Sequence, residues 1–94
     1  MNSYLVRFKT HPDPKNPGGI ILRYLRATDI THEEIPLKVT FPDKVKLQGA
    51  FLKAGLYLRA YGHPDQDRDV MPDPNQNYEV NDQMMRDIGF DLHA

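Results

Sequence analysis

Two stretches near the start of the chain alternate along the sequence, and a segment rich in proline and glycine separates them. In YLVRFK (residues 4–9), Tyr4, Val6 and Phe8 fall on one face. IILRYLRA (20–27) is largely apolar on both faces, which is typical of a central strand covered on both sides. The intervening HPDPKNPGG (11–19) holds three of the eight prolines and two of the six glycines, a composition typical of turns. The pattern predicts two strands joined by a long turn.

Two further segments alternate, and one shows a helix-start signal. PLKVTF (36–41) predicts a third strand with Leu37, Val39 and Phe41 inward, and YEV (78–80) predicts a short one. Between the second and third strands, Thr31 and Glu34 have the spacing of a capping box, and Pro36 follows at once. We therefore expect at most one helical turn in TDITHEE (28–34).

The longest periodic segment predicts the main helix, over residues 44–61. Its inward face recurs at steps of four, three, four and three residues: Leu47, Phe51, Ala54, Leu58 and Tyr61. Gly62 and Pro64 provide an end, while Gly49 and Gly55 would each cost about 1 kcal/mol inside a helix. LYLRAY (56–61) also alternates, so a fourth strand there stays an alternative.

A short C-terminal helix completes the predicted fold. Asn81 is suited to cap DQMMRDI and Gly89 to end it, and Phe90 and Leu92 follow as apolar residues that can dock on the body. The predicted class is α+β: a small antiparallel sheet of three to four strands packed against one main helix, about 44–61, plus this short helix. Ninety-four residues predict a single domain over 1–94.

Composition narrows the function classes. The chain has no cysteine, no signal-peptide pattern and no apolar run of membrane-spanning length, so we expect a cytoplasmic protein that binds no membrane. Ser3 is the only serine and no nucleophile or phosphate-binding motif occurs, which argues against an enzyme and against a cofactor. Charge is uneven: residues 1–63 carry ten basic and five acidic residues, and 64–94 carry two and eight. The acidic part either neutralises the basic part internally or faces a different partner.

The segment HPDQDRDV (63–70) raises the question of a metal site. Its alternating aspartates resemble the start of an EF-hand loop, but Val70 stands at the glycine position and Gln76 at the bidentate glutamate position. A divalent-metal-binding loop or metal-dependent enzyme around His63 and Asp65–Asp73 is therefore only a second alternative, and we expect no metal. The preferred interpretation is an acidic partner-binding loop formed by Asp65, Asp67, Asp69 and Asp73.

The main helix carries a second apolar stripe. Val45, Leu52 and Leu56 lie close together on the helical wheel, away from the inward face. Either the segment QMMRDIGF covers them, or they form a homodimer or partner interface to which Met84 and Met85 contribute adaptable contacts. Lys46, Lys53 and Arg59 would form its rim.

Nucleic-acid binding is the first alternative function. Four arginines interleave with aromatic residues, a pattern that can track phosphates and stack bases: Arg7, Arg23, Arg26 and Arg59. Against it, the chain is net acidic (−1) and shows no RNA-binding signature.

In general style, the chain is similar to small phage or mobile-element accessory proteins, including inhibitors of bacterial defence systems of the anti-CRISPR kind. The shared features are a compact cysteine-free sequence, proline-rich loops, split charge and no catalytic signature. This resemblance is one of type and carries no shared motif. The leading hypothesis is a non-catalytic protein–protein interaction module that inhibits a host protein by docking its acidic loop on a basic surface, such as the surface with which a host protein holds nucleic acid.

Overall fold

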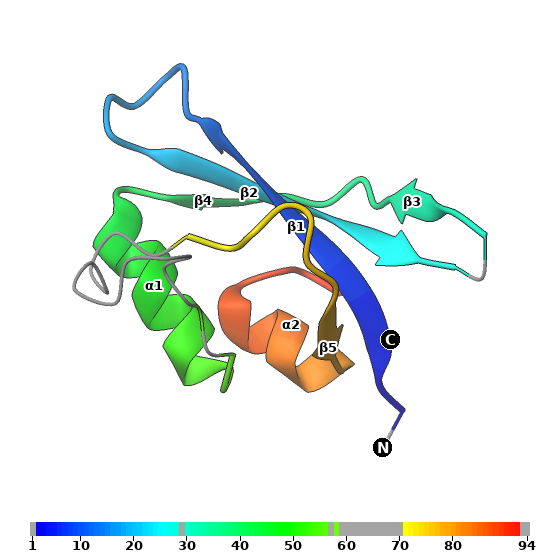
Figure 1. Ribbon diagram of the computed structural model, residues 1–94. Helices are drawn as coiled ribbons and strands as arrows, with labels where there is room; N and C mark the ends of the chain where they lie inside the picture. Colours follow the sequence, from blue (N-terminus) through cyan, green and yellow to red (C-terminus); the bar gives the residue numbers. More distant parts are fainter. Residues whose placement is uncertain (1, 29, 57, 59–70, 93–94) are drawn as a thin grey trace.

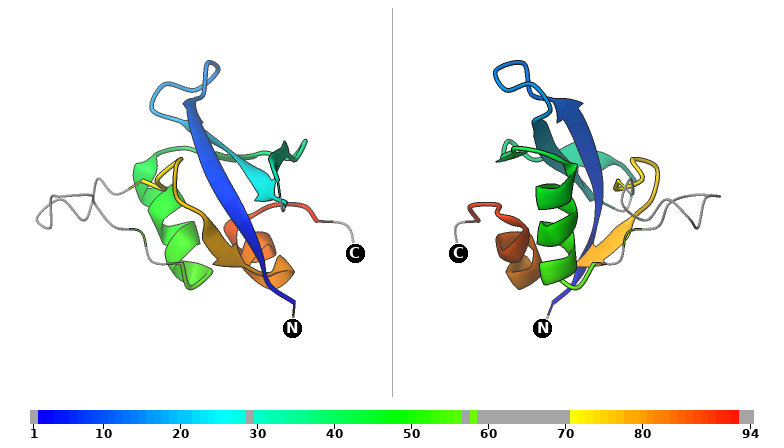
Figure 2. Two further views of the ribbon diagram at one scale, coloured as in Figure 1. Left: turned by 45° about the vertical axis from the view of Figure 1, so that its right-hand side comes forward. Right: turned by 90° about the vertical axis from the view of Figure 1, so that its left-hand side faces the viewer.

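A computed structural model of the chain (Figure 1) describes residues 2–28, 30–56, 58 and 71–92. The elements follow in the order β1 (Tyr4–Pro12), β2 (Ile20–Ala27), β3 (His32–Glu34), β4 (Val39–Phe41), α1 (Lys44–Lys53), β5 (Tyr78–Val80) and α2 (Asp82–Ile88). The five strands form one antiparallel sheet, and both helices lie on the same face of it (Figure 2). The predicted α+β class is confirmed.

The long β1–β2 hairpin is the centre of the sheet. Its register runs from Val6 opposite Arg26 to Pro12 opposite Ile20. In the connecting turn, Asp13 donates its N–H to the carbonyl oxygen of Gly19 (2.9 Å), and Gly18 adopts φ +82°. β5 pairs with the start of β1, while β3 and β4 pair with the two ends of β2 on its other side.

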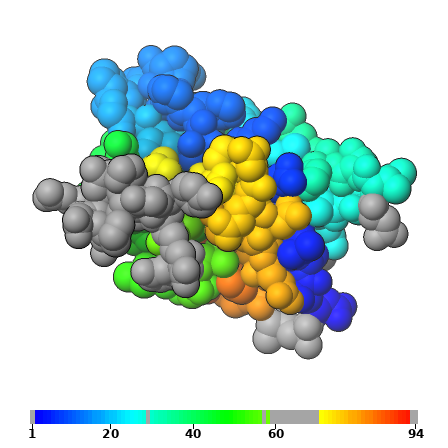
Figure 3. Space-filling model, viewed as in Figure 1, coloured from blue at the N-terminus to red at the C-terminus, as the bar shows by residue number. Residues whose placement is uncertain are grey.

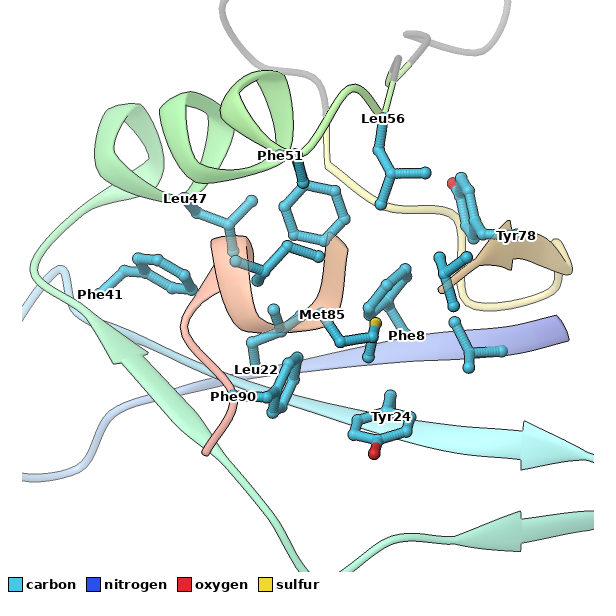
Figure 4. Packing of buried hydrophobic residues seen from close by; sticks show 14 of the residues in the cluster. Phe8, Leu22, Tyr24, Phe41, Leu47, Phe51, Leu56, Tyr78, Met85 and Phe90 are labelled. Atoms are coloured by element: carbon cyan, nitrogen blue, oxygen red, sulfur yellow. The ribbon is translucent and has the colours of Figure 1, made fainter. Parts of the chain in front are cut away.

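The core fills the space between the sheet and the helices (Figure 4). Phe8 of β1 is fully buried and meets Phe51 of α1 edge-on, with ring centroids 4.9 Å apart. Tyr24 of β2 packs similarly against Phe90, at 4.8 Å. The predicted inward residues Leu47, Phe51 and Ala54 are all buried.

The predicted helix end was wrong: α1 ends at Lys53, not near residue 61. Gly55 takes φ +77°, and its N–H donates to the carbonyl oxygen of Leu52 while the N–H of Leu56 donates to that of Phe51. This pair of bonds is a Schellman motif, which ends a helix at a left-handed residue. Gly55 is therefore a terminator, whereas the sequence pattern placed it inside the helix. The alternative strand over 56–61 lies mostly outside the described residues.

The sequence pattern allowed at most one helical turn after β2 and did not predict a strand there, whereas the structure has a turn followed by β3. Thr28 Oγ1 donates to the carbonyl oxygen of Thr31 (2.9 Å) and accepts from its N–H (3.0 Å), which closes the turn. His32 and Glu34 then pair with Ala27 and Leu25. Residues 32–34 therefore pair with β2 as a further strand of the sheet and do not start a helix, although the sequence has the spacing of a capping box.

The C-terminal part follows its prediction closely. Asn81 accepts a hydrogen bond from the N–H of Met84 (2.9 Å) and caps α2, and Gly89 ends it with φ +129°. Phe90 is buried in the core and Leu92 packs against it partly. The C-terminal helix is thereby fixed beneath the sheet and beside α1.

Candidate functional site

The outward face of α1 is the most exposed apolar surface on a regular element among the described residues. Val45 is 69 % exposed and Leu52 is 75 % exposed. They lie seven residues apart, so they share one face two turns apart, and Gly49 lies between them on the same face. A side chain at Gly49 would meet nothing within 4 Å, so this part of the helix is open and its backbone can be approached closely.

Lysines border this apolar stripe. Lys44 and Lys46 lie in the first turn and Lys53 in the last, all three are exposed, and α1 contains no acidic residue. Asp43, just before the helix, accepts from the N–H of Lys46 (2.9 Å) and acts as the N-cap. The α1 face, defined as Val45, Gly49 and Leu52 with these three lysines, is therefore an apolar stripe with a cationic rim.

The predicted interface of five residues is only partly outward. Val45 and Leu52 are exposed, as the second stripe requires, but Leu56 is 9 % exposed and Met85 is fully buried, so both belong to the core. Leu56 turns inward because the chain reverses at Gly55, and Met85 lies on the inner side of α2. Met84 is half-buried against the core. Leu56, Met84 and Met85 therefore contribute little exposed apolar area to the predicted interface. Arg59 of the predicted rim lies outside the described residues.

The acidic loop is described only at its end. Asp65, Asp67 and Asp69 lie outside the described residues, as does His63. Asp73 is half-buried: its carboxylate accepts from the N–H of Asn75 (2.9 Å), and its own N–H donates to the Tyr78 hydroxyl oxygen (2.9 Å). Asp73 therefore shapes the turn before β5, within the yellow-to-orange residues that occupy the middle of the surface in Figure 3.

The predicted arginine surface divides between the two faces of the sheet. Arg7 and Arg23 lie on the face away from the helices, together with Lys9, which the sequence interpretation left out. Arg26 does not share this face: it lies on the helix side, with its guanidinium 4.3 Å from the centroid of the Tyr4 ring. Arg59 lies outside the described residues. The phenylalanine and tyrosine side chains of the strands all lie on the helix side too. On the face of Arg7 and Arg23, the described strand rings are the imidazoles of His11 and His32.

A polar cluster closes the helix side of the sheet beside Arg26. The Tyr4 hydroxyl donates to Asp82 Oδ1 (2.6 Å), which links β1 to the first residue of α2. Burial raises the pKa of Tyr4 far above its usual value, and the bond to Asp82 raises it further. The Tyr4 hydroxyl stays protonated at neutral pH and is hydrogen-bonded to Asp82, so the cluster has the structural role of joining β1 to α2.

The described residues contain no group of three or more histidine and acidic side chains placed to hold a metal ion. No helix in the described parts of the chain is both long and apolar enough to span a membrane. Comparison of the chain with models of known families, with curated proteins and with solved structures finds no match. The candidate site therefore depends on the geometry of this chain alone, and its best-defined surface is the α1 face.

Proposed function

We propose that this protein is a non-catalytic protein-interaction module that binds a partner protein through its α1 face. The observation that carries the proposal is the exposure of Val45 and Leu52 on a helix with three lysines and no acid. A complementary partner offers an apolar groove bordered by carboxylates, into which a helix can be laid. Gly49 allows the groove wall to approach the helix backbone.

The charge of the helix favours a different protein over a second copy as the partner. In a two-fold interface, the same face of α1 would pack against itself. Lys44, Lys46 and Lys53 would then meet lysines with no helix carboxylate to pair with. Like charges brought together cost free energy, whereas an acidic rim gains attraction and speeds association. The homodimer predicted as an alternative is therefore the weaker proposal for this face.

The apolar stripe supplies useful but limited binding energy. Burying a leucine or valine fully is worth about 1.5–3 kcal/mol, and Val45 and Leu52 still have most of that area to bury. Losing one of them should weaken binding by about tenfold, since 1.4 kcal/mol corresponds to a factor of ten.

An inhibitor of a host protein is one kind of protein-interaction module. The acidic segment and the α1 face would, however, bind different kinds of host protein. A host protein that holds nucleic acid offers a basic surface, which suits the acidic residues Asp65, Asp67 and Asp69. The α1 face suits an acidic surface instead. We assign the contact to α1, because Val45 and Leu52 are exposed on a helix that carries three lysines and no acidic residue.

Affinity capture with matched variants tests the proposal. The bait is the full chain as wild type, Leu52→Gln, or Leu5→Gln, where Leu5 is an exposed residue (43 %) on the sheet face away from the helices. Glutamine is nearly as good a helix former as leucine, so the helix is kept. We expect a protein retained by wild type and by Leu5→Gln and reduced about tenfold with Leu52→Gln. Equal retention by all three baits would overturn the proposal.

A further inference from the structure

Basic side chains lie next to one another on the sheet face away from the helices. Lys9 of β1 is directly opposite Arg23 of β2, and Arg7 is two residues along the same strand on the same face. We call Arg7, Lys9 and Arg23 the cationic row.

This arrangement costs the fold free energy, because like charges directly opposite each other across a ladder are destabilising. Within the described part of the chain, neither Lys9 nor Arg23 makes an ion pair or a side-chain hydrogen bond. Arg7 donates only its Nε–H, to Asn77 Oδ1 (3.0 Å), which leaves its other N–H groups free. The cationic row is therefore uncompensated by described side chains.

The strand carboxylates on this face lie toward its other end, whereas Asp13 lies in the β1–β2 turn and accepts from the N–H of Lys15 (2.9 Å). Glu34 is opposite Leu25, and Glu79 is opposite Leu5 and accepts from the Ser3 hydroxyl (2.8 Å). The face is thus polarised, with its basic end near the β1–β2 turn. A polyanion bound at that end would relieve the repulsion between Lys9 and Arg23 and would avoid the two glutamates.

We propose that the cationic row binds the phosphate backbone of nucleic acid, as a second surface independent of the α1 face. Lys9 and Arg23 lie on neighbouring strands, which are about 4.8 Å apart, and Arg7 follows two residues along β1 on the same face. These three side chains present a group of charges that several adjacent phosphates can share. No described phenylalanine, tyrosine or tryptophan of the strands lies on this face, whose described strand rings are the imidazoles of His11 and His32. We therefore assign the contact to phosphates and not to stacked bases. Binding is accordingly independent of sequence and weak.

The salt dependence of binding tests this directly. A labelled 20-base-pair DNA duplex is titrated with the full chain between 20 and 200 mM salt, and binding is followed by fluorescence anisotropy. With three phosphate contacts, log K should fall with log [salt] with a slope of about −3, and replacing Lys9 or Arg23 by glutamine should reduce the slope by about 0.9 each. Lys53→Gln, on α1, is the matched control and should leave the slope unchanged. Absence of binding at 20 mM salt, or a slope that changes only with Lys53→Gln, would overturn the proposal.

Charge reversal separates binding from folding. Lys9→Glu places a carboxylate opposite Arg23, so the melting temperature should rise by about 1–5 °C while DNA binding is lost. A higher melting temperature with unchanged DNA binding would overturn the proposal. Competition with poly-glutamate at equal charge decides the partner class: we expect the duplex to be displaced poorly, and efficient displacement would assign the surface to acidic proteins instead.

Discussion

Leu56 donates its backbone N–H to the carbonyl oxygen of Phe51 at 2.9 Å, and this bond closes the end of α1. The same chain reversal brings the Leu56 side chain into the core beside Phe51. Leu52, which follows Phe51 directly in α1, is left in solvent. The boundary between core and candidate surface is therefore set by the helix end. Gly55 makes this end possible through its positive φ.

The two glycines of this region should respond oppositely to alanine. Gly49 is inside α1 with nothing within 4 Å of an added Cβ, so Gly49→Ala should stabilise the fold by about 0.5–1 kcal/mol. Gly55 has φ +77°, so Gly55→Ala should destabilise it by about 1 kcal/mol. Urea denaturation at neutral pH measures both free energies of unfolding. Changes of the same sign in the two variants would contradict the assigned helix end.

The bond from Tyr4 to Asp82 predicts a loss of stability in alkali. The pKa of Tyr4 is raised in the folded state, so the folded protein retains this proton where the unfolded chain, with a pKa near 10, has lost it. Stability from this group is therefore complete below about pH 10 and falls as pH rises above it. Burial also raises the pKa values of Tyr24 and Tyr78, which act in the same direction.

Urea midpoints measured between pH 8 and 11.5 test this alkaline loss. We expect a decline above about pH 10 in the wild type and a shallower decline in Tyr4→Phe, which cannot ionise at this position. Some decline should persist in the variant because Tyr24 and Tyr78 remain. Identical curves for the two proteins would show that the Tyr4 hydroxyl does not couple β1 to α2.

Reversing the acidic segment distinguishes it from α1 as the contact. In the triple variant Asp65→Lys, Asp67→Lys, Asp69→Lys, the α1 face is unaltered, and the added positive charge should favour an acidic partner. We expect the captured partner to be retained at least as well as by wild type. If the partner is lost and the salt dependence of capture changes, the acidic segment makes the contact, as first predicted from the sequence.

The pattern of alternation predicted most of the sheet because alternation and burial have the same cause. Val6, Phe8, Leu22 and Phe41 are inward because each strand has one face against the helices. β3 was missed because a local capping pattern, Thr31 with Glu34, competes in the sequence with pairing along β2, and long-range pairing carries no signal in a single short segment. The sequence also could not show that Gly55 ends α1, since a glycine inside a helix and one just after it look alike.

The candidate surfaces were predicted in part. The outward stripe of α1 was found from the helical wheel, but extending the helix past Lys53 placed the buried Leu56 in it. The arginine pattern grouped Arg7, Arg23 and Arg26, but the strand register places Arg7 and Arg23 on one face with Lys9 and Arg26 on the other. Period-two alternation within β1 and β2 could have separated Arg26 from Arg23, since odd and even positions point to opposite faces.

Site-specific photo-crosslinking tests the central claim most directly. A photoreactive amino acid replaces Leu52 on the α1 face or, as control, Gln76, which is exposed in the turn before β5. After irradiation in host lysate, mass spectrometry identifies any adduct. We predict an adduct at position 52 with a single protein, joined at an apolar groove bordered by carboxylates, and none of that protein at position 76. An adduct with that protein at position 76 but not at position 52, or no adduct at position 52 at all, would contradict the account.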